Sequence, residues 1–481
     1  MNMLLSRRQM LRQAMLGFGS IALTDMLARR AFGATTAAVA SPLSLNPLAA
    51  KTPNFPARAK RCIYIFLDGG LSHIDSYDYK PLLQRDDGKP LPASIAKPKF
   101  TFAPTGQLLK SPFEWKQWGR AGMWASDLFP KTNELLDELC FIHSLHHDNE
   151  DHFTAKNMIF TGSGREPRPP LGSWLAYGLG TENENVPAFI EIMPGTPKGS
   201  SAAFLPAQFG GIAIGRPDAK SRDREWDNLA GAAPGQRKAL DLVQAMNKDH
   251  LLQSARDRAI EAEIQNMELA FRMQSQAPEL MSLEGESAAT RALYGIGEEK
   301  TDDFGRACLM ARRFAEKGVR YITLMHSTRA FGNLWDQHKD LYNGHRNNAA
   351  AVDVPIAGLL RDLKSRGMLD DTLVLCGSEF GRTPVFEFQD GSEGRHRNGR
   401  DHNPHGFTMW FAGAGVKRAY RHGATDDYGY YAVQDKVSVF DLHATILHAM
   451  GLNHEKLTYR HGGRDYRLTD VYGNVVKAMF A

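Results

Sequence analysis

The sequence predicts an α/β fold, a doubly wound, mostly parallel sheet with helices on both faces and a helical insertion. Continuous apolar runs such as 61–67 (RCIYIFL) and 372–376 are typical of strands buried on both faces of a parallel sheet. Segments with apolar residues at helical spacing precede several runs, which indicates alternating helices and strands. Residues 237–276 are polar, Ala- and Glu-rich and nearly free of Gly and Pro, so a helical cap is expected within about 220–298.

The expected elements follow in chain order. Strands are predicted at six apolar runs: 61–67, 139–142, 188–193, 321–325, 372–376 and 407–412. A helix at 304–317 (FGRACLMARRFAEK), stopped by Gly318, precedes the strand at 321–325, and a helix at 351–366 precedes the strand at 372–376. Because helix and strand alternate in this way, parallel strands joined by crossover helices are expected.

The N-terminal region is predicted to be an export signal. Arg7 and Arg8 precede a weakly apolar stretch at 16–23 (LGFGSIAL) that is too short to span a bilayer, which needs roughly 20 apolar residues. Small residues follow, as in secretory signals, and paired arginines select the twin-arginine route. We therefore expect a signal at 1–34, a disordered linker at 35–56 and a folded domain at 57–481, delivered by the twin-arginine (Tat) translocation machinery to the periplasm or the exterior.

Composition narrows the function classes. The chain of 481 residues has 42% hydrophobic and 23% charged residues and a net charge of +4, as expected of a soluble globular protein without a nucleic-acid footprint. No stretch of the mature chain is apolar enough for a transmembrane helix. The four cysteines are far apart in sequence, which predicts buried thiols and not a metal-binding or redox pair.

Histidines and carboxylates gather where the predicted strands end. Ligands of open α/β sheets bind beyond the carboxyl ends of the strands, so these residues are the candidate site. They are Asp68, His152, Asp336, His338 and Glu379, which follow strands, and His402 and His405, which precede the strand at 407–412. Imidazole with carboxylate suits zinc, manganese or iron, and carboxylate alone favours calcium or magnesium. The spacing of Asp336 and His338 puts both on one face of an extended segment.

Several segments resemble known proteins. The run ending in Asp68-Gly69-Gly70, the stretch 372–381 and the segment 441–452 (DLHATILHAMGL) are similar to segments of the alkaline phosphatase superfamily, which includes sulfatases. A closer resemblance is to the bacterial domain-of-unknown-function family 1501, through Asp68-Gly69-Gly70, 335–338 (WDQH), 379–384 (EFGRTP), 399–402 (GRDH) and 463–465 (GRD). The resemblance implies the superfamily fold over the mature chain and metal-ligand roles for Asp68, Glu379 and His402.

Two departures from the superfamily bear on function. Phe380 stands where the superfamily has a metal-binding His, so a complete two-metal site is in doubt. The segment 151–162 is the best counterpart of the phosphatase nucleophile segment, and it puts His152 where a Ser or Thr is expected, with Thr154 as the nearest hydroxyl. His152 could then act as a base or a covalent partner.

Two hypotheses follow. The first is a sulfatase-like, metal-dependent hydrolase of sulfate or phosphate esters, small-molecule or glycan, using a divalent ion such as zinc, manganese or calcium. Its ligand pool is Asp68, Asp336, His338, Glu379 and His402, with His345 and His405 in reserve, and its catalytic candidates are His152 and Thr154. The second is a non-catalytic relative that binds a glycan or a cell-surface partner.

Overall fold

The computed structural model describes residues 47–95, 105–165, 167–183, 185–192, 201–215, 235–253, 280, 282–327, 333–387 and 398–481. The predicted export signal and the first part of the linker lie outside these ranges. Residues 47–56 of the predicted linker lie against the domain, because the Lys51 amide donates to the Leu179 carbonyl and the Asn54 amide to the Gly451 carbonyl. A search of the described helices finds none with the length and apolar character that a bilayer crossing needs.

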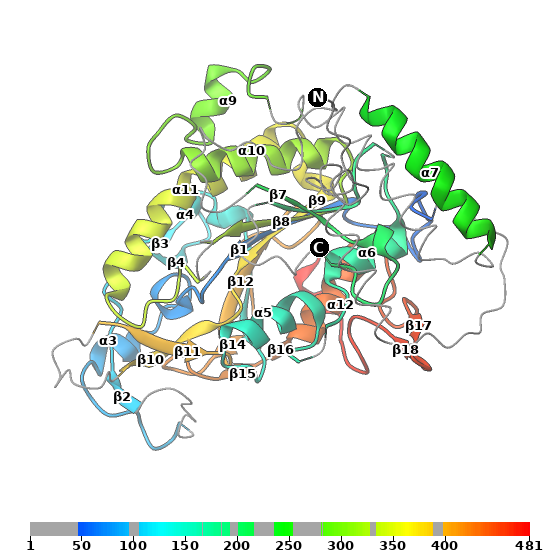
Figure 1. The fold of residues 1–481 in the computed structure, drawn as a ribbon. Coiled ribbons are helices and arrows are strands. Elements are labelled where there is room, and N and C mark those ends of the chain that lie inside the picture. The colour runs from blue at the N-terminus through cyan, green and yellow to red at the C-terminus, as the bar shows by residue number, and fades with distance from the viewer. Residues whose placement is uncertain are drawn as a thin grey trace, which may run out of the picture.

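A nine-stranded sheet forms the centre of the molecule (Figure 1). Its order is β13-β5-β12-β9-β1-β8-β6-β7, with β16 also paired to β5. The strands are β1 (Arg61–Leu67), β5 (Cys140–His146), β6 (Phe189–Ile192), β7 (Ile212–Ile214), β8 (Tyr321–His326), β9 (Thr372–Gly377), β12 (Phe407–Ala412), β13 (Tyr420–His422) and β16 (Val437–Ser438). All pairs are parallel except those of β12, which is antiparallel to β5 and β9. The predicted α/β class with a mostly parallel sheet is confirmed.

The apolar runs form the sheet because both faces are covered. β1 pairs with β8 through Cys62 and Tyr321 and with β9 through Cys62 and Leu373. Every residue of β1 after Arg61 is buried, as are all of β8 and β9. A strand with two covered faces cannot alternate polar and apolar residues, which is why the runs were recognisable in the sequence. The four cysteines are free and buried, as predicted.

Helices cover both faces of the sheet. Figure 1 shows α10 (Asp302–Glu316) and α11 (Leu341–Ser365) on one side, with α5 (His152–Thr161), α6 (Leu171–Leu179) and α12 (Val439–Ala449) on the other. α10 is followed by Gly318 in the left-handed region, as its sequence predicted. α11 begins ahead of the predicted 351, because its first turns (LYNGHRNNAA) lack an apolar stripe. The remaining described α-helices are α3 (Pro81–Arg85), α4 (Pro130–Asn133), α7 (Gln236–Gln253) and α9 (Ala288–Leu293).

The predicted helical insertion is described only in part. α7 covers its first stretch, whereas residues 216–234 and 254–279 lie outside the described residues. Figure 1 shows α7 at the periphery, away from the central strands.

A second, three-stranded sheet was not predicted. It has the order β11-β10-β2 and consists of β2 (Thr105–Leu108), β10 (Gly381–Glu387) and β11 (Arg400–Asn403). Pro384 in β10 and the polar sequence RDHN of β11 hide both strands from a search for apolar runs. The described residues also form three antiparallel strand pairs: β3 (Trp115–Trp118) with β4 (Met123–Ser126), β14 (Ala424–Thr425) with β15 (Ala432–Gln434), and β17 (Tyr459–His461) with β18 (Arg464–Tyr466).

Candidate metal centre

The topology gathers the predicted residues at one edge of the sheet. β1, β8 and β9 run parallel, and β5 has the same direction because both it and β9 are antiparallel to β12. Their carboxyl ends therefore meet at one edge, and the residues after them converge there. Asp68 follows β1, the helix that begins at His152 follows β5, Asp336 and His338 follow β8, and Glu379 follows β9. His402 arrives from β11 of the small sheet.

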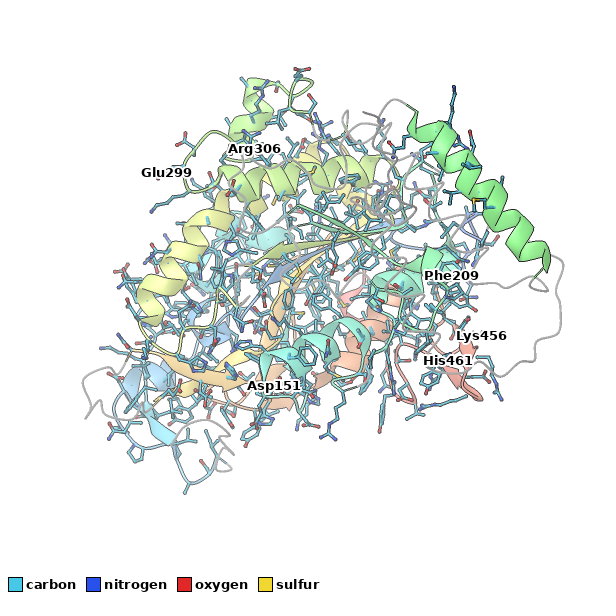
Figure 2. All side chains as sticks on the ribbon, in the orientation of Figure 1. Asp151, Phe209, Glu299, Arg306, Lys456 and His461 are labelled. Carbon is cyan, nitrogen blue, oxygen red and sulfur yellow. The ribbon has the colours of Figure 1, made fainter. Side chains whose placement is uncertain are left out.

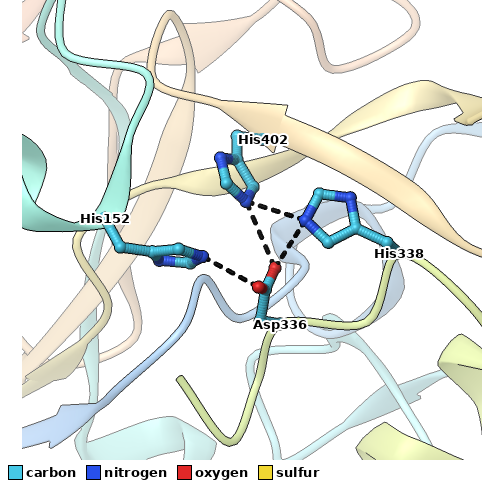
Figure 3. Close-up of side chains that lie close together, drawn as sticks. All are labelled: His152, Asp336, His338 and His402. Atoms are coloured by element: carbon cyan, nitrogen blue, oxygen red, sulfur yellow. Dashed lines mark hydrogen bonds and ion pairs between the residues drawn. The ribbon is translucent and has the colours of Figure 1, made fainter. Parts of the chain in front are cut away.

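Four of these side chains form a compact cluster, here called the metal centre. One ligand atom from each of His152, Asp336, His338 and His402 lies within 4.8 Å of the others (Figure 3). The Asp336 carboxylate lies 3.0 Å from Nε2 of His152, 2.8 Å from Nε2 of His338 and 3.2 Å from Nε2 of His402. The Nε2 atoms of His338 and His402 are only 3.0 Å apart.

Each histidine of the centre is held from behind through Nδ1. Nδ1 of His152 lies 2.7 Å from Oε1 of Glu379, and Nδ1 of His402 lies 2.7 Å from the Glu150 carbonyl oxygen. Nδ1 of His338 bonds the Glu387 carboxylate. A carboxylate or carbonyl at Nδ1 holds the proton on that nitrogen, so the lone pair is on Nε2, the atom that faces the centre. Three imidazoles thus present acceptor atoms to a common point.

That arrangement fits a cation. Two unprotonated ring nitrogens 3.0 Å apart repel one another unless a proton or a metal ion lies between them. Nε2 of His152 is buried and, among the described residues, has no partner in hydrogen-bond geometry. Ligands of a tetrahedral zinc ion about 2.0 Å from the metal are about 3.3 Å apart, close to the separations in the centre. Three imidazoles and a carboxylate suit zinc, manganese or iron, whereas calcium prefers oxygen ligands.

The electrostatics show how strongly Asp336 attracts positive charge. Burial opposes ionisation of Asp336, but His152, His338, His402 and the Arg382 guanidinium together hold its pKa far below the usual range. Burial also acts to lower the pKa of His338, but hydrogen bonds to Asp336 and Glu387 outweigh it and raise that pKa to about 9. His402 differs, because burial, with Arg382 and His152 nearby, lowers its pKa to about 4.

Asp336 is fixed in place by a buried arginine. Nη2 of Arg382 donates to Oδ1 of Asp336 at 2.7 Å, and Nε of Arg382 donates to the Gly70 carbonyl at 2.9 Å. The same guanidinium donates to the carbonyls of Trp335 and Arg400, so it ties the segments after β1 and β8 to β11. Arg382 itself is fully buried. The carboxylate is therefore presented in a single orientation.

His152 begins helix α5, and Thr154 belongs to its cap. Asp151 is the N-cap residue and accepts from the Thr154 amide at 3.0 Å; Figure 2 marks it at the start of the helix. The Thr154 hydroxyl also bonds the Asp151 carboxylate. The structure thus places His152 among the four clustered side chains, and it places the Thr154 hydroxyl in a helix cap.

Asp68 and Glu379 form a second layer beside the centre. Oδ1 of Asp68 is 3.0 Å from Nζ of Lys156, and the Ser327 hydroxyl bonds its other oxygen. Oε2 of Glu379 accepts from the Gly69 amide at 3.0 Å while Oε1 meets His152. Burial and the nearby Glu379 raise the pKa of Asp68. The expected convergence of Asp68, Glu379 and His402 is therefore observed, although neither Asp68 nor Glu379 is among the four clustered ligands.

The two reserve histidines lie elsewhere. The His405 ring packs against Tyr430 and Tyr431, with centroids 5.8 and 5.4 Å away. Nε2 of His345 accepts from the Ser72 amide at 3.1 Å inside the protein.

Phe380 is fully buried and stacks on His402, with ring centroids 4.4 Å apart. Glu387 was missed because it ends β10, a strand without an apolar run, and Lys156 was missed because lysine is not among the metal-ligand residue types that were sought after the strands.

Comparison with known proteins assigns the family. The profile of the family described as "Protein of unknown function (DUF1501)" matches residues 59–480. The chain belongs to this family. The predicted membership is confirmed, and the match spans nearly all of the described fold. No curated protein sequence matches the chain.

Solved structures similar to this DUF1501 protein include sulfatases and phosphatases. PsFucS1 sulfatase from Pseudoalteromonas sp. has 12% identity and a TM-score of 0.34, with 92% of this chain and 72% of that chain covered. The alkaline phosphatase from the Antarctic bacterium TAB5 has 10% identity and a TM-score of 0.33, with 84% and 99% covered. The lipoteichoic acid synthase LtaP from Listeria monocytogenes has 9% identity and a TM-score of 0.34, with 88% and 78% covered.

Proposed function

We propose that the chain is an exported, sulfatase-like hydrolase that uses one divalent transition metal ion to cleave sulfate or phosphate esters. The observation that carries this proposal is the metal centre itself: three imidazoles turn Nε2 toward one carboxylate, and each Nδ1 is engaged from behind. Zinc or manganese fits this donor set, so of the ions expected from the sequence calcium matches it least. Export rests on Arg7 and Arg8 and on passage through the Tat machinery to the periplasm or the exterior.

The side chains of the centre are partly exposed to solvent. The side chains of His152, Asp336 and His338 are 14%, 23% and 24% exposed, whereas that of His402 is 7% exposed. A bound ion would supply charge stabilisation to the ester oxygens and lower the pKa of water at its open side.

The roles of the chain's own residues follow from their contacts. His152, with Nδ1 on Glu379, would hold a bound ion through Nε2, which would leave the attack on the ester to water. Thr154 is held by Asp151 and stabilises the start of α5. Arg382 keeps Asp336 oriented. The carboxylates of Glu379 and Glu387 hold a proton on Nδ1 of His152 and of His338, which leaves Nε2 of each ring to face the centre.

A direct experiment separates this function from the alternative of a non-catalytic glycan-binding or surface-binding protein. The purified chain is loaded with zinc or manganese and assayed on aryl sulfates and aryl phosphates, beside the variant Asp336→Asn. We expect turnover by the parent and loss of both metal and turnover in the variant. If the unmodified protein binds metal but hydrolyses neither ester class, the proposed hydrolase function is wrong and the non-catalytic binding function is favoured.

A further inference from the structure

The feature behind the further inference is the ammonium group of Lys156, which lies in the second layer among oxygen atoms. Nζ donates to Oδ1 of Asp68 at 3.0 Å and to Oδ1 of Asn333 at 2.9 Å. The Lys156 side chain is 13% exposed and that of Asp68 is fully buried. Lys156 also interacts electrostatically with Glu379, whose side chain is fully buried. A positive charge therefore lies in contact with the buried Asp68 carboxylate and within electrostatic range of the buried Glu379 carboxylate.

The residues that would hold a second ion do not fit one. Both Glu379 oxygens already accept hydrogen bonds, from the Gly69 amide and from His152. Phe380, which follows Glu379, has no ligand atom and stacks on His402. One Asp68 oxygen accepts from Lys156 and the other from Ser327. Among the described residues, the two-metal arrangement expected of the superfamily therefore has no free second ligand set.

We propose that the Lys156 ammonium takes the place of a second metal ion, so that the protein has a single metal centre beside a built-in cation. Lys156 compensates the charge of Asp68, as a divalent ion would, and its Nζ occupies the space that such an ion needs. This inference deepens the proposed function, since it rests on the metal centre, but it concerns metal stoichiometry and not turnover.

The oxygens around Lys156 predict which ion would replace it. Without Lys156, Asp68 and Asn333 would each have one oxygen released from its hydrogen bond, beside the negative charge of Glu379, and oxygen atoms are the ligands of magnesium, calcium and manganese. The metal centre offers three nitrogens and one carboxylate and suits zinc. Removing the lysine side chain should therefore create a second site that differs from the first in ion preference.

The test is the metal stoichiometry of the full chain in zinc and manganese, measured by native mass spectrometry and elemental analysis. We expect one ion per chain in the parent and two in Lys156→Ala, with the second being manganese. Adding Asp68→Asn to Lys156→Ala should remove the second ion and leave the first. Lys156→Arg, which keeps a cation, and Lys131→Ala, which removes an exposed partner of Glu134, should both retain one.

Two outcomes would overturn the inference. The first is a parent chain that binds two ions, one of them lost in Asp68→Asn, a result that does not depend on whether Lys156→Ala folds. The second is a folded Lys156→Ala that still binds only one ion at saturating manganese. Failure of the ester hydrolysis assay leaves both readouts intact, so the inference and the proposed hydrolase function can fail separately.

Discussion

Two polar clusters that each contain His and Asp flank Arg382, and they differ in how their side chains are arranged. The first is the metal centre. The second, the Asp75–Arg400 cluster, consists of Ser72, Asp75, His345 and Arg400, and all four side chains are buried. Arg382 touches both, because its guanidinium donates to Asp336 on one side and to the Arg400 carbonyl on the other.

In the Asp75–Arg400 cluster the charged atoms meet partners within the protein. Nε of Arg400 donates to Oδ2 of Asp75 at 2.7 Å, and the Ser72 hydroxyl bonds the same carboxylate. Nε2 of His345 accepts from the Ser72 amide, and burial lowers the pKa of His345 to about 3, so its ring stays neutral. In the metal centre, by contrast, the Nε2 atoms of three histidines converge on one carboxylate, and in the metal-free chain it is the proton of His338 that pairs with Asp336. The comparison teaches that the convergence of several Nε2 atoms on one carboxylate, and not the presence of His and Asp alone, distinguishes the candidate ligand site from the ion-paired cluster.

The largest expected effect sharpens this comparison. Arg400→Met leaves the buried Asp75 carboxylate without its cation, so we expect a loss of about 3–5 kcal/mol in the free energy of unfolding. Metal bound per folded chain should not change, because Arg400 does not contact the metal centre through its side chain. Urea denaturation with metal analysis of the folded fraction measures both. A variant of normal stability that has lost its metal would reverse the roles given to the two clusters.

A smaller effect is expected behind His338. Glu387→Ala removes the carboxylate that holds the proton on Nδ1 of His338, so metal affinity should fall about 10- to 100-fold, or roughly 1.4–2.7 kcal/mol. Zinc affinity measured by competition with a chelator gives the value. The matched control is Glu134→Ala, which removes an exposed partner of Lys131. Equal affinities for Glu387→Ala and the parent would mean that Glu387 does not orient a ligand.

The stability of the metal-free fold and the affinity for metal should change with pH in opposite directions. The pKa of His338 rises from 6.5 to about 9 in the folded, metal-free chain. Its ion pair with Asp336 therefore stabilises that state fully below pH 6.5, and this stabilisation is lost as pH rises through 9. Metal must displace the same proton, so metal affinity should increase from pH 6.5 to 9, with proton release on binding.

Melting temperature against pH, with and without zinc, tests both signs in one series. His338→Gln is the control, because it lacks the titrating group and should flatten both curves in this range. Parallel curves for the loaded and metal-free parent would contradict the assignment of His338 as a ligand.

The smallest expected effect concerns the start of α5. Asp151→Ala removes the N-cap acceptor of the Thr154 amide, so stability should fall by about 1 kcal/mol. Thr154→Val, which removes only the hydroxyl, should have a smaller effect still and keep any ester hydrolysis. Chemical denaturation and the aryl ester assay measure the two. If a stable, metal-loaded Thr154→Val variant lost turnover, the Thr154 hydroxyl would have to take part in the reaction.

Much of the fold was predictable, for a physical reason. The runs at β1, β8 and β9 are buried on both faces, so their sequences carry a continuous apolar signal. β10 and β11 carry no such signal, because Pro384 interrupts β10 and polar and charged residues make up β11. The small sheet that contains His402 was therefore missed.

The site was predictable by position but not by role. Strand ends identified the residues that converge, because the carboxyl ends of parallel strands share one edge. Whether a histidine ligates depends on contacts across the chain: His338 meets Glu387 through Nδ1, whereas His345 receives the Ser72 amide through Nε2. Spacing cannot encode such contacts. The approach of His152 to Asp336 likewise exists only in three dimensions, so the sequence offered no basis for grouping these two residues, and the role of His152 as a base or covalent partner stays a prediction.

The central claim is that His152, Asp336, His338 and His402 bind one metal ion, and metal binding by His402→Ala tests it most directly. The parent and the variant are stripped with a chelator, reloaded with zinc and analysed for bound metal, with His345→Ala as the control from the Asp75–Arg400 cluster. The account predicts one ion in the parent and in folded His345→Ala, and a loss of tight binding in His402→Ala. Retention of zinc at parental affinity by His402→Ala, or a parent that binds no ion, would contradict it.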